Sequence, residues 1–127
     1  AMSHILITYD LASSPSSPHG ALLDAAEGQN LLYVYKVKSG DLLRLPNTTL
    51  WGEFATVKAA TDAFDRAVAS AAEKIGRKIV VEKRAATILS GSLYSDLRKA
   101  PEARWTKKSG FETCREHQLK DPFFTAE

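Results

Sequence analysis

The sequence predicts an α+β domain in which strands and helices alternate along the chain, and three observations lead to this prediction. The 127 residues are 44% hydrophobic and 25% charged, values that are typical of one globular domain. Short β-branched apolar runs alternate with segments whose apolar residues recur every three or four positions. Clusters of Gly, Pro and Ser separate these segments, as expected for turns.

The first strand is expected at His4–Asp10, because this run is short, β-branched and apolar on both faces, as in a strand buried within a sheet. A Ser/Pro loop follows, whose last serine, Ser17, can cap a helix with Pro18 at its first position. That helix has a short apolar face, and Gly28 can end it.

The sequence of residues 31–76 predicts two strands and the helix with the clearest apolar spacing in the chain. Leu31–Val37 alternates in side-chain type, and Thr48–Trp51 is β-rich and begins a third strand. The apolar residues of Val57–Ile75 recur at spacings of three and four, which is the pattern of an amphipathic helix. Thr56 can cap this helix and Gly76 can end it.

Residues 78–89 predict either one strand with a charged middle or two short strands. The order strand, helix, strand, strand, helix, strand is that of a ferredoxin-like βαββαβ sandwich, which we expect for residues 2–90. Residues 91–127 are expected to form a basic, aromatic-containing C-terminal extension, with short helices around 93–97 and 111–119. Both helices of the sandwich would cover one sheet face, so a second subunit or the extension would cover the other.

Composition indicates the oligomeric state and the compartment. Alanine accounts for 18 residues, each of which buries little area, so we expect a partner subunit to complete the core of a homodimer. Cys114 is alone and cannot form an intramolecular disulfide, which favours a reducing, cytoplasmic location. No apolar run approaches the ~18 residues of a membrane span, so no membrane association is expected.

The net charge of +2 conceals an asymmetry along the chain. Residues 1–73 contain five basic and eight acidic side chains, for −3, whereas residues 74–127 contain twelve basic and seven acidic ones, for +5. A basic half raises the expectation of a polyanionic partner such as RNA or DNA. An ordinary solvated surface is the alternative explanation.

Asp10 is the candidate catalytic and metal-binding residue, because a carboxylate at the end of a central strand projects to solvent from a rigid backbone. The alternative is that Asp10 caps the turn that follows it. One carboxylate cannot enclose Mg²⁺ or Mn²⁺. Water, phosphate oxygens or Asp10 of a symmetry mate would have to complete the coordination.

Several side chains are candidates for nucleic-acid binding, because they are cations, hydroxyl groups or aromatic rings near this strand end or on other strands. The alternative is that the threonines and Trp51 only pack within a sheet and that the cations are ordinary surface charges. The candidates are Tyr9, Lys36, Lys38, Arg44, Thr48, Thr49, Lys83 and Arg84.

Two segments, Ile7-Thr8-Tyr9-Asp10-Leu11 and Leu45-Pro46-Asn47-Thr48-Thr49-Leu50-Trp51-Gly52, together with the two helices, carry a family resemblance. Over about residues 3–90 the chain resembles the superfamily of the second CRISPR-associated protein. That superfamily includes the VapD-type ribonucleases and small relatives with a Ser/Thr-Thr-Trp strand.

The resemblance implies a ferredoxin-like homodimer in which Asp10 approaches its mate and holds a divalent metal that assists phosphodiester hydrolysis. Two carboxylates that share Mg²⁺ can activate water and offset charge on the scissile phosphate. CRISPR members usually carry Arg just after this Asp, whereas this chain has no Arg before Arg44. The second hypothesis is therefore a non-catalytic dimeric interaction or regulatory protein of the toxin–antitoxin type.

Overall fold

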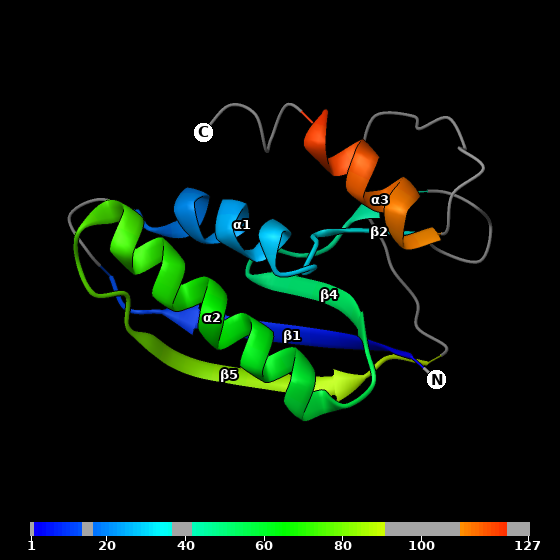
Figure 1. The fold of residues 1–127 in the computed structure, drawn as a ribbon, viewed down its shortest axis with the longest axis horizontal. Coiled ribbons are helices and arrows are strands. Elements are labelled where there is room, and N and C mark those ends of the chain that lie inside the picture. Colours follow the sequence, from blue (N-terminus) through cyan, green and yellow to red (C-terminus); the bar gives the residue numbers. More distant parts are fainter. Residues whose placement is uncertain (1, 14–16, 37–41, 91–109, 122–127) are drawn as a thin grey trace.

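The computed structural model describes residues 2–13, 17–36, 42–90 and 110–121, which form an α+β fold with antiparallel sheets (Figure 1). This confirms the α+β class predicted from the sequence. The elements, in chain order, are β1 Ser3–Leu11, α1 His19–Gly28, β2 Val34–Lys36, β3 Leu42–Arg44, β4 Thr49–Phe54, α2 Val57–Ile75, β5 Val81–Ile88 and α3 Gly110–Leu119.

Strand β1 is central in a three-stranded antiparallel sheet of order β4-β1-β5, as its apolar character predicts. Ile5, Ile7 and Tyr9 are buried on the face toward the helices. The other face was also expected to be buried, but Thr8 and Asp10 are exposed there. The reason is that α1 and α2 pack together over one side of the sheet only, where α2 lies across β1 (Figure 1).

Helix α2 begins and ends where the sequence predicts. The Thr56 hydroxyl oxygen accepts a hydrogen bond from the Ala59 amide at 3.0 Å. Gly76 has a φ of 74°, the left-handed conformation that glycine adopts without steric strain. The apolar stripe of the helix includes Phe64, which is fully buried against the Tyr9 ring with 5.0 Å between the centroids.

The βαββαβ order predicts one four-stranded sheet. This is wrong in one respect, because the second strand pairs mainly with β3 in a separate two-stranded sheet. Leu32 exchanges two backbone hydrogen bonds of 2.8 Å with Trp51 of β4, but this is an isolated bridge. The chain then forms a two-stranded antiparallel hairpin, in which Val34 of β2 pairs with Arg44 of β3. The short segment Leu42–Arg44, where the sequence predicted no strand, provides this local partner. The order β5-β1-β4-Leu32 is compatible with a ferredoxin-like fold.

The C-terminal helix covers part of the second sheet face. Helix α3 confirms the helix predicted at 111–119, and its Phe111 packs against Trp51 with 5.4 Å between the rings. Phe111 and Cys114 belong to the same hydrophobic core as the strands. The helix expected around 93–97 lies outside the described residues.

The rest of the second sheet face is uncovered among the described residues. Residues of β1 and β5 that lie directly opposite each other, such as Thr8 and Ala85, place their side chains on the same face. Strand β5 is one continuous strand, which decides between the two predicted alternatives. We call the exposed side chains on this face the open face: Thr8, Asp10, Lys83, Ala85 and Thr87.

Candidate functional site

Asp10 lies exposed on the open face near the end of β1, directly opposite Lys83 of β5. Such pairs have Cβ atoms about 4.5–5.5 Å apart, so the two side chains leave the sheet next to each other. The next residue, Leu11, pairs with Val81, so Glu82 is an extra residue in β5 and forms a bulge beside Asp10. Bulges redirect neighbouring side chains and are common next to active sites. Asp10 therefore has a position that a metal ion or a second molecule can reach.

The described residues do not complete a metal site around Asp10. They contain no group of three or more His, Cys, Asp and Glu side chains that could hold a metal ion. Mg²⁺ typically retains several waters and binds one or two carboxylates together with substrate phosphates. Asp10 fits this chemistry as one contributor, and further oxygen ligands would come from water, a phosphate or a second copy of the chain.

The two cations predicted on β5 point to opposite faces of the sheet. Lys83 is on the open face beside Asp10, whereas Arg84 lies opposite Tyr9 on the side of the helices. The Arg84 guanidinium forms an ion pair with Asp65 of α2. Only Lys83 of this pair is therefore positioned to meet a phosphate near Asp10.

The cations predicted around the hairpin are also separated from Asp10. Lys36 is exposed at the end of β2, and Lys38 lies outside the described residues. Arg44, at the end of β3, forms an ion pair with Asp121. The structure therefore does not gather the described candidate cations into one basic patch.

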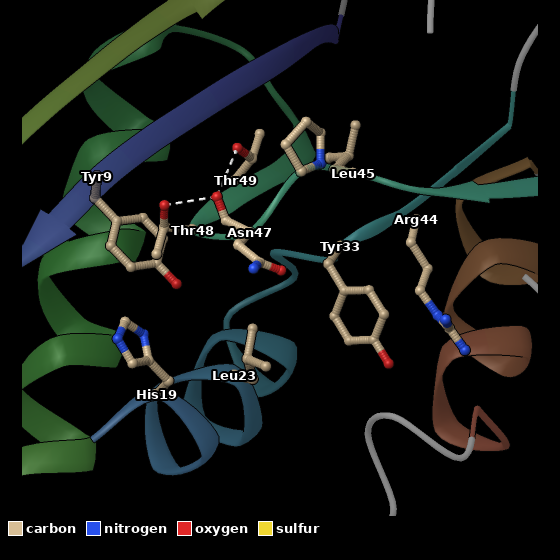
Figure 2. A pocket seen from close by; sticks show the side chains of 10 residues that line it. Tyr9, His19, Leu23, Tyr33, Arg44, Leu45, Asn47, Thr48 and Thr49 are labelled. Atoms are coloured by element: carbon tan, nitrogen blue, oxygen red, sulfur yellow. Dashed lines mark hydrogen bonds between the residues drawn. The ribbon is translucent and has the colours of Figure 1, made fainter. Parts of the chain in front are cut away.

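A cavity of about 330 Å³ opens between the start of α1, the end of β1 and the turn that precedes β4 (Figure 2). Four of the predicted nucleic-acid-binding residues line it, which are Tyr9, Arg44, Thr48 and Thr49. The remaining lining residues are His19, Leu23, Tyr33, Leu45, Pro46 and Asn47. Sequence reasoning named none of this second group as a site residue. His19, Leu23 and Tyr33 are distant from the other lining residues in the chain, and Leu45, Pro46 and Asn47 entered only through the family resemblance.

Tyr9 presents its hydroxyl group to this cavity while its ring belongs to the core. The side chain is 3% exposed, and Figure 2 shows the hydroxyl directed into the space above α1. Burial raises the pKa of Tyr9 to about 12. The hydroxyl is therefore neutral at physiological pH and can both donate and accept a hydrogen bond.

A buried polar network fixes the opposite wall of the cavity. Asp121, which is 1% exposed, accepts a hydrogen bond of 2.8 Å from the Tyr33 hydroxyl and another of 2.8 Å from Arg44 Nε. The Gln118 side-chain oxygen accepts a hydrogen bond of 2.8 Å from the Tyr33 backbone amide. Burial, together with the hydrogen bond to Asp121, raises the pKa of Tyr33. The network therefore joins the end of α3 to the hairpin.

The turn before β4 is held in an unusual conformation at the edge of the cavity. Thr48 has a φ of 59°, which is rare for a β-branched residue and costs about 1–3 kcal/mol. Its hydroxyl donates to the Asn47 carbonyl oxygen at 2.6 Å, and its own carbonyl oxygen accepts from the Tyr9 amide at 3.0 Å. The end of β1 and this turn are therefore one rigid unit.

The position of Trp51 matches the alternative in which it packs within the fold. Trp51 is only 2% exposed, and its indole nitrogen donates a hydrogen bond to the Val34 carbonyl oxygen. The rings of His4, Tyr35 and Phe111 surround it. Trp51 therefore packs in the core, and Thr49, at 9% exposure, is also buried.

Comparison with protein-family models, with curated proteins and with solved structures finds no match for this chain. Among the residues that the structure describes, no helix combines the length and the apolar character that crossing a bilayer requires. Two features of the described residues are therefore the basis for functional inference: Asp10 on the open face, and the cavity beside Tyr9.

Proposed function

We propose that this chain is a cytoplasmic, ferredoxin-like protein that forms a homodimer through its open face and binds RNA or DNA. In this proposal Asp10 of the two copies holds Mg²⁺ or Mn²⁺ for phosphodiester cleavage. The observation that supports it is the exposed Asp10 at the bulged end of the central strand, on a face that the described residues leave uncovered.

The open face suits contact between two copies because its side chains other than Lys83 are small or short. Thr8, Ala85 and Thr87 lie on neighbouring strands and present a flat, weakly polar surface. Most dimers have a twofold axis, so each residue of such an interface meets the same patch on the partner. Asp10 of both copies would then be available to one ion, which could activate water and stabilise the charge developing on a phosphate.

A second candidate function follows from the surroundings of Asp10. Lys83 lies directly opposite it, and an ammonium group competes with a metal ion for the carboxylate. Arg44 and Arg84 are already in ion pairs with Asp121 and Asp65. These contacts favour a dimer that binds a partner without cleaving it, as in a regulatory or toxin–antitoxin protein.

Cleavage assays on the whole chain test the first proposal. Labelled RNA and DNA are incubated with purified protein and Mg²⁺, Mn²⁺ or EDTA, and sedimentation measures the oligomeric state. We expect metal-dependent cleavage by a dimer and its loss in Asp10→Asn, with an unchanged melting temperature because Asp10 is exposed. The matched control is Glu73→Gln, an exposed position on α2. A monomer, or equal cleavage by wild type and Asp10→Asn, contradicts the proposal.

The Lys83→Ala variant separates the two candidates. If Asp10 binds a metal ion, removal of the competing ammonium group should lower the metal concentration needed for half-maximal cleavage. If the protein only binds, no variant cleaves, and Lys83→Ala weakens salt-sensitive binding to nucleic acid. A protein that neither cleaves nor binds nucleic acid refutes both forms of the nucleic-acid proposal.

A further inference from the structure

The cavity beside Tyr9 has the size and the rigidity of a small-molecule site. Its volume of about 330 Å³ is at the lower end of the range of ~300–1,000 Å³ for ligand pockets. Tyr9 is fixed by Phe64 behind it, and Tyr33 is fixed by the buried Asp121. The Thr48 backbone is bonded to β1. Flat aromatic side chains on fixed supports form a cavity that is largely organised before a ligand binds.

Polar groups without a protein partner line this cavity. Among the described residues, no hydrogen bond uses the hydroxyl of Tyr9, although this side chain is 97% buried. The hydrogen bonds of Asn47 use its backbone oxygen, and that of His19 uses its backbone amide. The Asn47 amide and the His19 ring are thus available, and Figure 2 shows the Asn47 amide and the Tyr9 hydroxyl directed into the cavity. The Tyr9 hydroxyl oxygen is not one of the buried side-chain atoms that lack a partner, so a ligand or water in the cavity can reach it.

The charge of the cavity indicates a neutral ligand. Among the described residues that line the cavity, Arg44 is the only Arg or Lys, and none is Asp or Glu. The Arg44 guanidinium is bonded to Asp121 through both Nε and a terminal nitrogen, so its charge is compensated. A free phosphate would therefore find little uncompensated positive charge. A neutral ring with donors and acceptors on its edge would meet both the flat walls and the free polar groups.

We infer that this cavity binds a purine or pyrimidine base, the neutral, planar heteroaromatic group that satisfies these conditions. The Tyr9 hydroxyl and the Asn47 amide would bond to the edge of the base, and Leu23 and Pro46 would contact its surface. The base has two sources, a free nucleoside or an unpaired base of a bound strand. The inference does not depend on a metal ion at Asp10, because side chains of Tyr9 and Asp10 leave β1 on opposite faces.

The test uses the full chain and calorimetric or NMR titration with adenosine, guanosine, cytidine and uridine. A single-stranded oligonucleotide and the same oligonucleotide with abasic positions form the second arm. We expect saturable binding of at least one nucleoside, or of the oligonucleotide but not its abasic form, with Kd below about 1 mM. Binding of nucleosides identifies a free ligand, and dependence on bases in the strand alone identifies a nucleic acid.

Two variants assign the binding to this cavity. Tyr9→Phe and Asn47→Ala each remove hydrogen-bonding capacity and should weaken binding about 2- to 12-fold, the value of one net hydrogen bond. Asn47 is exposed, so its replacement keeps the test valid even if Tyr9→Phe lowers stability. Tyr35→Phe is the matched control, because the Tyr35 hydroxyl is bonded to His4 outside this cavity.

Three results overturn the inference: no base-dependent binding in either arm, equal binding of the intact and abasic oligonucleotides without nucleoside binding, or unchanged affinity in both cavity variants. Asp10→Asn should leave base binding unchanged while it removes any cleavage. Failure of base binding and failure of the cleavage proposal can therefore be distinguished in the same preparation.

Discussion

Replacement of Asp121 by alanine should be among the most damaging single changes in the chain. The carboxylate is 1% exposed and accepts hydrogen bonds from the Tyr33 hydroxyl and from the Arg44 guanidinium. Asp121→Ala leaves both donors without this acceptor in the interface between α3 and the hairpin. The loss should therefore reduce the stability of the whole fold, since α3 contributes Phe111 and Cys114 to its core.

The size of the expected stability loss follows from the burial of the Asp121 and Arg44 side chains. Removal of one member of a buried ion pair costs about 3–5 kcal/mol, because the remaining charge is left without compensation. The Arg44 side chain is 26% exposed, so water solvates part of its charge and the lower end of that range applies. We expect a loss of about 3 kcal/mol, which for a urea m value of about 1–3 kcal/mol/M lowers the midpoint by about 1–3 M.

Urea denaturation followed by circular dichroism measures this change. A double variant, Arg44→Met with Asp121→Ala, removes both charges and should be more stable than the sum of the single effects by about 0.5–3 kcal/mol. Asp62→Ala, which breaks the exposed pair with Lys58, is the control and should leave the midpoint unchanged. A loss below about 1 kcal/mol in Asp121→Ala, or strict additivity in the double variant, would refute the role assigned to the network.

Three further predictions concern other parts of the fold. Burial lowers the pKa of His117 below its usual 6.5, so the unfolded state binds more protons and stability should fall as the pH decreases below about 6.5. Between pH 7.5 and 5, the melting temperature of His117→Gln should therefore fall less than that of the wild type, and an equal fall would contradict this role. Thr56→Ala removes the cap of α2 and should cost about 1 kcal/mol in urea denaturation, and an unchanged midpoint would contradict the cap. Gly52→Ala would place a Cβ atom 2.5 Å from the Asn30 carbonyl oxygen, a backbone atom, and should destabilise by about 1–3 kcal/mol; wild-type stability would show that the backbone relaxes.

The parts of the fold that the sequence predicts are those with a local signal. Helix α2 shows this most clearly, because its apolar spacing, the Thr56 cap and the left-handed Gly76 all lie within one short segment. Strand β1 is likewise predicted from a continuous apolar run. The sheet was less predictable, because the choice between pairing Leu32 with β4 and pairing Val34 with β3 depends on competing partners along the chain.

The cavity could be predicted only in part, for the same reason. Tyr9, Thr48 and Thr49 were candidates because they lie in or beside predicted strands, but the wall opposite them depends on contacts over long separations. Asp121 is 88 residues from Tyr33 and 77 from Arg44, and no periodicity or motif relates them. The burial of a hydrogen-bonded carboxylate is a property of the folded chain, and sequence patterns do not encode it locally.

The two proposals meet at the end of one strand. Tyr9 and Asp10 are consecutive, and strand geometry directs the first toward the helices and the cavity and the second toward the open face. The bulge at Glu82 and the turn at Thr48 hold this end from both neighbouring strands, since Leu11 pairs with β5 and the Tyr9 amide bonds to Thr48. A strand of nucleic acid that passed around this end of the sheet could place a base beside Tyr9 and a phosphate beside Asp10. If so, Tyr9→Phe should weaken substrate binding without changing the metal requirement, whereas Lys83→Ala should change the metal requirement without changing base affinity.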